Sequence, residues 1–342
     1  MPREHRVTIR EIARMTGVST QTVSRVINKR PDVALATRQA VETAISEVGF
    51  QPSEVARSLV QRRSRTLGVI VAGLRHFGVS QTLNGITDES EKAGFGLLLK
   101  EIDRFDTADI SPVIDFLAAH RVEGIIYAAP HLGMDPATLR RRLPTGGPPI
   151  VLLKAPASDD FTTIGIDNYG GARVATEHLI GLGRRRIAHV AGPLDWLESR
   201  ERLRGWRAAL ADARLGPGGL EEGAWSSVSG EVAFGRIVDV DPAVDAVFAG
   251  NDQMALGVLR AAHLRGMRVP DDVALVGFDG LAEGAQLVPS LTTVVQPLTE
   301  LGALAVRRLL ADLTAEAGDH AVEAILLPTE LVVRESAPGR RS

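Results

Sequence analysis

From Leu67 onward, short apolar runs alternate with longer amphipathic segments, and this alternation leaves few folds open to the chain. The apolar runs are LGVIVA, GLLLKE, GIIYAA, PIVLLK, TTIGID, RIAHVAG, AVFAGN and VALVGFDG, and the helical patterns between them span 80–93, 107–120, 136–143, 168–182, 199–213 and 253–265. Strands that alternate with helices in this way are typical of a parallel α/β sheet. Because the runs fall into two sets, the sequence predicts two doubly wound lobes.

Polar residues follow two of these predicted strands. Asn251 and Asp252 come directly after AVFAG, and Asp279 follows VALVGF. In open α/β sheets, ligands bind beyond the carboxyl ends of the strands, so these residues mark a candidate ligand site. Asp252 and Asp279 could also serve as an acid/base pair. No HExxH pair, GxSxG elbow, P-loop or GxGxxG after a strand accompanies them, so we expect no enzyme.

The first part of the chain has a different pattern, that of two short helices joined by a tight turn between Val7 and Asn28. Thr8 can cap the first helix, and Glu11 stands three residues later to complete a capping box. Gly17 permits the turn, and Ser19 can cap the second helix. These signals predict a compact helical hairpin.

The second helix of this hairpin separates apolar from hydrogen-bonding residues. Val23 and Val26 have the spacing of an inward face. Thr20, Gln21 and Arg25 remain on the outside. In the major groove, Gln matches the edge of adenine and Arg matches the O6/N7 edge of guanine. We therefore predict an all-α helix-turn-helix head that binds double-stranded DNA, and an ordinary solvated hairpin is the alternative.

The charge distribution supports this division of the chain. Positions 1–65 carry 12 Lys and Arg against 6 Asp and Glu, a net charge of +6, whereas the remainder carries 27 against 36, a net charge of −9. A basic head is attracted to phosphate, while an acidic body avoids nonspecific adhesion to it. DNA binding should therefore weaken steeply as salt is added.

Composition excludes several other classes of protein. The chain has 342 residues, 44% of them hydrophobic, and no cysteine. Without cysteine there is no disulfide framework and no thiolate zinc site, and we expect neither a metal nor a cofactor. The N-terminus has no apolar signal region, and no apolar run is long enough to span a bilayer, which predicts a cytoplasmic protein without a membrane partner. We assign His76, His131 and His263 to the surface or to loops.

Between head and body lies a segment whose structure the sequence leaves open. An amphipathic helix is predicted at 33–48, after which Gly49 and Pro52 interrupt the chain. The run SEVARSLV at 53–60 is too short to be stable as an isolated helix, so we expect it to fold only on DNA or in a dimer. A plain flexible linker is the alternative, and residues 61–65 would form its basic exit.

Motifs along nearly the whole chain resemble those of the lac repressor (LacI/GalR) family of transcriptional regulators. In chain order they are VTIREIARMTGVSTQTVSRVIN, ARSL, EHLIGLGRRRIAHVAGP, RLRGW, GNDQMALG, GFDG, LTTVVQP and LLPTELVVRES. At AGPL, RGW, the region of Trp225 and NDQMALG, the body is more similar to the lac repressor itself than to the purine-responsive members. Such an ordered series is highly specific.

The resemblance implies a helix-turn-helix head followed by an α/β two-lobed, periplasmic-binding-protein-like (type I) effector domain. The predicted limits are 1–52 for the head, 53–65 for the hinge helix and linker, 66–342 for the effector-binding and dimerisation domain, about 66–165 and 296–326 for its N-lobe, and about 166–293 and 327–336 for its C-lobe. Family members dimerise, so the operator should be an approximate palindrome.

The resemblance also assigns residues to DNA. Thr20, Gln21 and Arg25 would read base edges in each half-site. The residues expected to hold phosphates or neighbouring bases are Ser19, Thr22 and Asn28. Leu59 would be the hinge wedge inserted from the minor groove, with Ala56 beside it, and two such hinges would kink the operator at its centre.

In the body, the resemblance implies a sugar site. Arg202 and Asp279 match the family's partners for sugar hydroxyls, with Asn251 between them and Trp225 as an apolar wall. Core packing is the alternative for Trp225. The residues that align with the near-lobe side of the cleft are Phe77, Val79, Arg104 and Gln296.

The sequence also departs from the lac repressor at several positions. Lys154 stands where that protein has an acidic residue, which favours an acidic or phosphorylated sugar or an ion pair with Glu198 or Asp195. Thr20 replaces an aromatic residue, so the operator sequence should differ. Ala34 replaces a usual capping serine, which should cost that helix about 1 kcal/mol. The chain ends without leucine heptads, which predicts a dimer rather than a tetramer.

These features predict a repressor of sugar-utilisation genes that releases its palindromic operator when a sugar binds. A corepressor that strengthens DNA binding is the alternative. A sugar-binding transport protein would share the body, but it would carry a signal peptide and no basic head.

Overall fold

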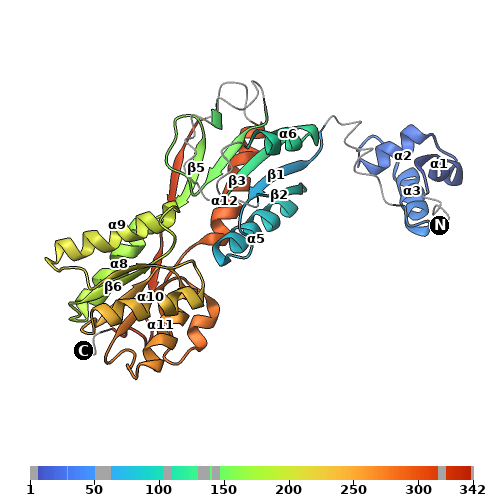
Figure 1. Cartoon of the computed structure of the whole chain (residues 1–342). Helices are drawn as coiled ribbons and strands as arrows, with labels where there is room; N and C mark the ends of the chain where they lie inside the picture. Colours follow the sequence, from blue (N-terminus) through green and yellow to red (C-terminus); the bar gives the residue numbers. More distant parts are fainter. Residues whose placement is uncertain are drawn as a thin grey trace. The chain divides into compact units, whose positions relative to one another are not determined.

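The computed structural model describes residues 7–28, 30–50, 63–102, 110–129, 139–140, 147–314 and 321–339. The chain divides into two compact units, Met1–Ser64 and Arg65–Ser342 (Figure 1). Both units are built as the sequence patterns predict, an all-α head and an α/β body with two sheets.

The head contains three helices, α1 (Ile9–Thr16), α2 (Thr20–Ile27) and α3 (Leu35–Glu47). The Glu11 carboxylate accepts the Thr8 backbone N–H at 2.7 Å, which completes the expected capping box. Gly17 ends α1 with φ 66°, and Ser19 caps α2. The core of the head consists of buried residues from all three helices, Ile12, Ala13, Val23, Val26, Val41 and Ala44.

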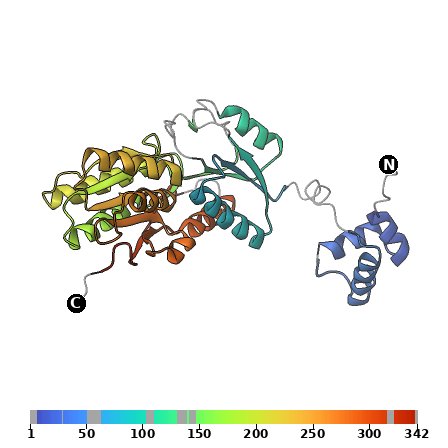
Figure 2. The ribbon, with the colours of Figure 1, turned by 60° about the horizontal axis from the view of Figure 1, so that its bottom comes forward.

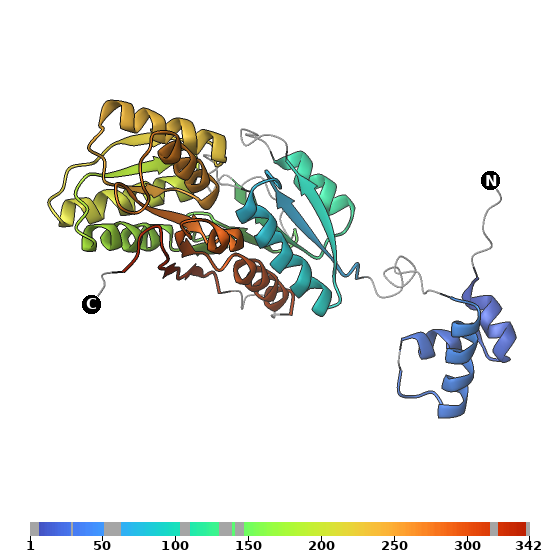
Figure 3. The same ribbon diagram turned by 90° about the horizontal axis from the view of Figure 1, so that it is seen from below.

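The first sheet of the body has six strands in the order β11-β5-β4-β3-β1-β2, all parallel. The strands are β1 (Thr66–Val71), β2 (Gly96–Glu101), β3 (Gly124–Ala128), β4 (Ile150–Leu153), β5 (Thr162–Ile166) and β11 (Ala324–Leu327). One face packs on α5 (Phe77–Lys92) and α12 (Leu298–Thr314), which lie side by side (Figure 3), and the other on α6 (Ser111–Ala119). We call this half the near lobe.

The second sheet has the order β12-β10-β9-β8-β6-β7, and only β12 runs antiparallel to its neighbour. Its strands are β6 (Ile187–Ala191), β7 (Leu220–Glu222), β8 (Ala246–Ala249), β9 (Ala274–Asp279), β10 (Thr292–Val295) and β12 (Glu330–Val332). One face packs on α8 (Asn168–Gly181) and α9 (Leu197–Asp212), the other on α10 (Ser227–Val240) and α11 (Asp252–Leu264). We call this half the far lobe, and Figure 2 shows helices on both sides of each sheet.

The chain passes between the two lobes at three places. It crosses from β5 to α8, returns from β10 to α12, and crosses again from β11 to β12. Each lobe is therefore completed by residues far away in the sequence. The three short connections limit how the lobes can rotate relative to each other.

Some elements differ from the sequence predictions. Helix α5 begins at Phe77 rather than at residue 80, because the turn after β1 leads directly into it. Helix α10 lies in a stretch where no helix was predicted. The hinge run 53–60 and most of the predicted helix at 136–143 lie outside the described residues. Within the described ranges, no helix is long and apolar enough to cross a membrane.

Candidate functional site

Helix α2 presents an exposed polar surface on the head. Thr20, Gln21 and Arg25 are exposed, while Val23 and Val26 are buried in the core of the head. The three residues predicted to read bases thus share the solvent side of one helix. Arg25 forms an exposed ion pair with Asp32, in the connection between α2 and α3, at 3.5 Å.

The residues predicted to bind phosphate lie at the two ends of α2. The Ser19 hydroxyl accepts the Thr22 backbone N–H at 3.1 Å and lies 2.9 Å from the Thr22 hydroxyl. At the other end, Asn28 Nδ2 donates to the Ser24 carbonyl at 2.8 Å. Their side chains therefore also cap the helix. Ala56 and Leu59, predicted for the hinge, lie outside the described residues.

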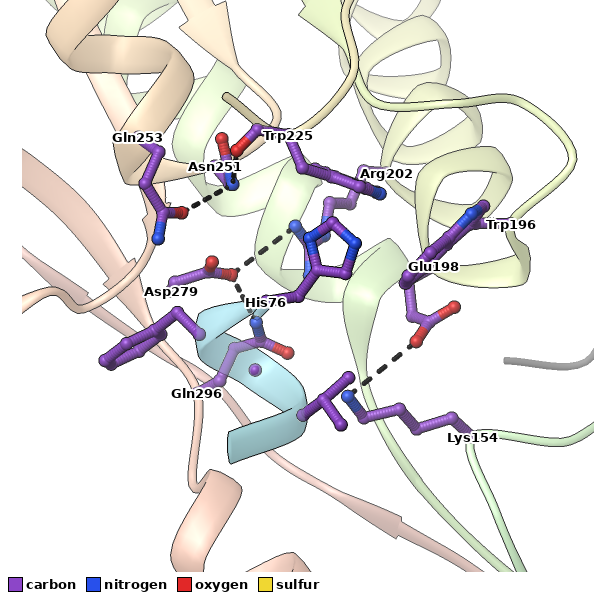
Figure 4. A pocket seen from close by; sticks show the side chains of 13 residues that line it. His76, Lys154, Trp196, Glu198, Arg202, Trp225, Asn251, Gln253, Asp279 and Gln296 are labelled. Atoms are coloured by element: carbon purple, nitrogen blue, oxygen red, sulfur yellow. Dashed lines mark hydrogen bonds and ion pairs between the residues drawn. The ribbon is translucent and has the colours of Figure 1, made fainter. Parts of the chain in front are cut away.

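In the body, a cleft lies between the two lobes. It is lined by His76, Phe77, Gly78, Val79, Lys154, Trp196, Glu198, Arg202, Trp225, Asn251, Gln253, Asp279 and Gln296 (Figure 4). Every predicted effector residue within the described ranges is among them. Arg104, the remaining one, lies outside those ranges.

The cleft collects the first residues of several helices. The near lobe contributes the start of α5 and Lys154, which follows β4. The far lobe contributes residues at the starts of α9 and α11, Trp225 just before α10, and Asp279 at the end of β9. Gln296 follows β10 at the second crossing between the lobes. This placement follows the rule that ligand sites form beyond the carboxyl ends of parallel strands.

Arg202 and Asp279 form a buried ion pair at the far-lobe side of the cleft, with Arg202 Nη1 3.6 Å from Asp279 Oδ1. Arg202 Nε also donates to Asn168 Oδ1 at 2.8 Å, and its Nη1 donates to the Gly250 carbonyl. Burial raises the pKa of Asp279, and Arg202 and Lys154 oppose this rise. Burial lowers the pKa of Arg202, which the carboxylate of Asp279 opposes. Each charge therefore stabilises the other.

The hydrogen bonds around this pair fix its orientation. Gln296 Nε2 donates to Asp279 Oδ1 at 2.6 Å. The Arg202 guanidinium carbon lies 3.9 Å from the ring centroid of Phe278. A pre-oriented guanidinium can donate to one hydroxyl of a ligand, while the carboxylate beside it accepts from a neighbouring hydroxyl.

Asn251 and Trp225 lie next to this pair and support each other. Asn251 caps α11 by accepting the Met254 N–H at 2.8 Å, and its Nδ2 donates to the Trp225 carbonyl at 3.2 Å. The Trp225 ring lines the cleft, packs against the far-lobe core and meets Trp196 edge-on at 5.7 Å. Trp225 thus serves both as a cleft wall and as a packing residue.

Lys154 pairs with Glu198 across the cleft, one of the two partners anticipated from the sequence. The Nζ to Oε1 distance is 3.8 Å, and both side chains are buried. Burial lowers the pKa of Lys154, while Glu198 and then Asp279 raise it. The ammonium is therefore held among carboxylates, and this pair joins the two lobes directly.

The backbone is strained at this cleft. Lys154, Trp225 and Asp279 have φ values of 54°, 62° and 116°, in the region that favours glycine. Such conformations cost about 1–3 kcal/mol each and gather at functional sites. Because all three side chains line the cleft, the strain accompanies their placement toward a ligand.

The sequence reasoning missed four cleft residues, namely His76, Gly78, Trp196 and Gln253, and it anticipated Glu198 only as a partner of Lys154. His76 was assigned to the surface or a loop, and it does precede α5. However, it lines the cleft and meets Trp196 edge-on at 5.4 Å. The available signal was its position after β1, because loops that follow parallel strands face the ligand edge of the sheet.

Asp252, considered with Asp279 for acid/base chemistry, does not line the cleft. It is fully buried, accepting the Thr293 hydroxyl at 2.6 Å and the Leu281 backbone N–H at 2.6 Å. It therefore joins the start of α11 to β10 and to the turn after β9. Within the described ranges, no group of three or more His, Cys, Asp or Glu side chains is arranged to hold a metal ion.

The two units match two family models. Residues 8–53 match the model for bacterial regulatory proteins of the lacI family, and residues 176–337 match the model for a periplasmic binding protein-like domain. An exposed recognition helix on a small head, followed by a two-lobed domain with a ligand cleft, defines a DNA-binding transcriptional regulator. The similarity to relatives extends this match to nearly the whole chain.

The ribose operon repressor of Halalkalibacterium halodurans is 32% identical over 97% of both chains. The solved lac repressor dimer bound to operator and the anti-inducer ONPF has a TM-score of 0.89, with 32% identity over 97% of this chain and 99% of that chain. A solved complex of the transcriptional regulator CelR with cellobiose has a TM-score of 0.71, with 34% identity over 97% of this chain and 100% of that chain. The chain belongs to the lacI family of bacterial regulatory proteins.

Proposed function

We propose that the protein is a repressor of sugar-utilisation genes and that it releases its operator when a sugar binds the inter-lobe cleft. The single observation that carries the ligand class is the buried Arg202–Asp279 pair beside the Trp225 ring. A sugar offers hydroxyls for such a pair and an apolar C–H face for such a ring. The names of relatives point the same way, toward ribose and cellobiose.

DNA recognition follows from the head. Thr20, Gln21 and Arg25 enter the major groove of each half-site, while Ser19, Thr22 and Asn28 hold the backbone. Two chains associate, so the operator is an approximate palindrome, and Ala56 and Leu59 of each chain act at its centre. The protein works in the cytoplasm, where its DNA lies. A sedimentation mass of two chains at micromolar concentration is expected, and a mass of four chains would contradict the dimer.

The coupling between the sites is a linkage between lobe angle and DNA affinity. A sugar that contacts both lobes favours one lobe angle, and the three connections between the lobes confine the motion to a rotation. In a dimer this rotation shifts the two near lobes against each other. The paired hinge segments, within residues 53–65, then lose their fit to the minor groove.

The test is operator binding measured by fluorescence anisotropy at fixed salt, with and without a panel of neutral and acidic sugars. At least one sugar is expected to lower operator affinity, and the same sugar should be recovered unchanged after incubation. An increase in affinity would reverse the sign and make the ligand a corepressor. If no sugar changes affinity, the proposed function fails.

A further inference from the structure

Lys154 and Glu198 form a second ion pair in the cleft, separate from the Arg202–Asp279 pair (Figure 4). Lys154 follows β4 of the near lobe, and Glu198 lies in the first turn of α9 in the far lobe. Only 14% and 7% of their side-chain surfaces are exposed. Both charges are thus removed from bulk water. A charge that is shielded from water interacts more strongly with a ligand.

The geometry of the pair leaves room for a third group. At 3.8 Å, Lys154 Nζ and Glu198 Oε1 are too far apart for a direct hydrogen bond. The other carboxylate oxygen, Glu198 Oε2, is buried and has no hydrogen-bond partner among the described residues. A buried polar group without a hydrogen-bond partner is costly. A ligand therefore gains affinity if it donates a hydrogen bond to Glu198 and accepts one from Lys154. A hydroxyl does both, because its O–H donates to Glu198 and its oxygen accepts from Lys154.

The charge balance of the cleft decides which ligands fit. Lys154 and Arg202 supply two positive charges, and Glu198 and Asp279 supply two negative charges. A carboxylate or phosphate near Lys154 would also face Glu198, and a buried like-charge contact costs several kcal/mol. An uncharged ligand meets no such repulsion.

We propose that Lys154 and Glu198 form a charge-neutral clamp that binds a hydroxyl of an uncharged sugar and excludes the corresponding sugar acids and sugar phosphates. This inference rests on the proposed function, because it names the class of sugar that the cleft admits. It also replaces one expectation drawn from the isolated lysine, that of an acidic or phosphorylated ligand. The unit of selectivity is the pair and not Lys154 alone.

The test compares affinities for matched neutral and anionic ligands by isothermal titration calorimetry on the full chain. The panel consists of neutral mono- and disaccharides with their acids or phosphates, including ribose with ribose 5-phosphate and cellobiose with cellobionate. The wild type should prefer the neutral member of the bound pair by about tenfold or more. In Glu198→Gln this ratio should fall to about one or reverse, because Lys154 then stands without its carboxylate.

Two further variants separate the clamp from a general loss of folding. The exchange Lys154→Glu with Glu198→Lys keeps the cleft neutral and should restore the preference for the neutral sugar. Glu201→Gln, on the same helix in a surface pair with Arg204, should behave as the wild type. Thermal unfolding of each variant establishes that it is folded before titration.

The outcomes distinguish this inference from the proposed function. Tighter binding of the anionic member by the wild type would overturn the clamp and leave a sugar-responsive regulator in place. An unchanged ratio in Glu198→Gln would overturn it equally. If no member of the panel binds at all, the proposed function falls and the clamp falls with it.

Discussion

A Cβ atom on Gly192 would lie 2.1 Å from Cη2 of Trp225, so the indole ring occupies its place only because residue 192 has no side chain. Gly192 follows β6 directly, and Trp225 stands just before α10. The wall of the cleft therefore depends on a glycine that does not itself line the cleft.

Gly192→Ala is expected to push Trp225 out of its position. Sugar affinity should then fall by about tenfold, equivalent to about 1.4 kcal/mol, and calorimetry would measure it. Operator affinity without sugar should be unchanged, because the head does not include this region. Gly216→Ala is the matched control, since its added Cβ would meet nothing within 4 Å. Equal sugar affinity in the two variants would refute the role of Gly192.

Asp279→Asn should destabilise the body and remove the sugar response. It leaves the buried Arg202 charge without its carboxylate, and breaking such a pair costs about 3–5 kcal/mol of unfolding free energy, measured by urea titration. Asp212→Asn breaks the exposed pair with Arg173 instead and should cost about 1 kcal/mol or less. Similar losses in both variants would show that the cleft pair contributes no special stability.

His189 should make the protein less stable in mild acid. Its ring is fully buried, with Nδ1 donating to the Phe248 carbonyl at 2.9 Å, and burial lowers the pKa of His189 from 6.5 to about 4. Between these values the unfolded chain binds a proton that the folded chain does not, so stability falls as pH falls from 6.5 toward 4. The full effect is about 3 kcal/mol. His189→Asn should remove this part of the dependence of the unfolding free energy on pH. Parallel curves of unfolding free energy against pH for the wild type and the variant would contradict the prediction.

Asp252 should contribute a slope of the opposite sign. Burial, and then the charge of Asp279, raise the pKa of Asp252 to about 7 from 3.8. The folded chain keeps this proton through a range in which the unfolded chain has lost it, so stability falls as pH rises from about 4 toward 7. In Asp252→Asn, denaturation between pH 5 and pH 7 should show a more positive slope than in the wild type. If the wild type and the variant have the same slope, Asp252 does not hold a proton in the folded chain over this pH range.

Arg25 should contribute both affinity and base preference. It is exposed on α2 beside Gln21, and a bidentate contact to guanine discriminates by about 1–3 kcal/mol. Arg25→Ala should weaken operator binding by that amount and should remove the base preference at one position of the operator. Fluorescence anisotropy with single-base operator variants would measure both effects. Arg25→Lys should keep the salt dependence but lose the base preference. If Arg25→Lys keeps both, the residue contacts phosphate only.

The head was predictable because its signals are local. Thr8, Glu11, Gly17 and Ser19 each act within one turn of the chain, and the structure has each of them in its expected capping or turn position. These caps define the limits of the helices without any tertiary contact. Side-chain chemistry already matched Gln21 and Arg25 to base edges. Family resemblance added the expected roles of Ser19, Thr22 and Asn28.

Helix α10 was missed because its glycines weaken the helical pattern. In the structure Gly230 of α10 allows close packing, because a Cβ on it would lie 2.3 Å from the Met254 carbonyl. Gly257 of α11 does the same from the other side, because its Cβ would lie 1.9 Å from the Ser227 carbonyl. The two helices α10 and α11 meet backbone to backbone. That reason lies in a partner helix and not in the local sequence.

The cleft was only partly predictable for a similar reason. The rule for strand ends identified Asn251 and Asp279, and resemblance added the other predicted residues. Trp196 and Glu198 follow β6, so the same rule covers them, but no motif in the intervening loop singled them out. The distance between Lys154 and Glu198 depends on the lobe arrangement, which no sequence window contains.

The three crossings between the lobes have a consequence for how the chain is completed during synthesis. The outer strand of the near-lobe sheet, β11, and the antiparallel outer strand of the far-lobe sheet, β12, are both drawn from residues 324–332. Until these residues leave the ribosome, β5 and β10 each remain as open sheet edges, which are prone to pair with other chains. Both sheets of the body are therefore completed by the same late segment of the chain during synthesis. Truncation before residue 324 would leave two aggregation-prone sheet edges exposed.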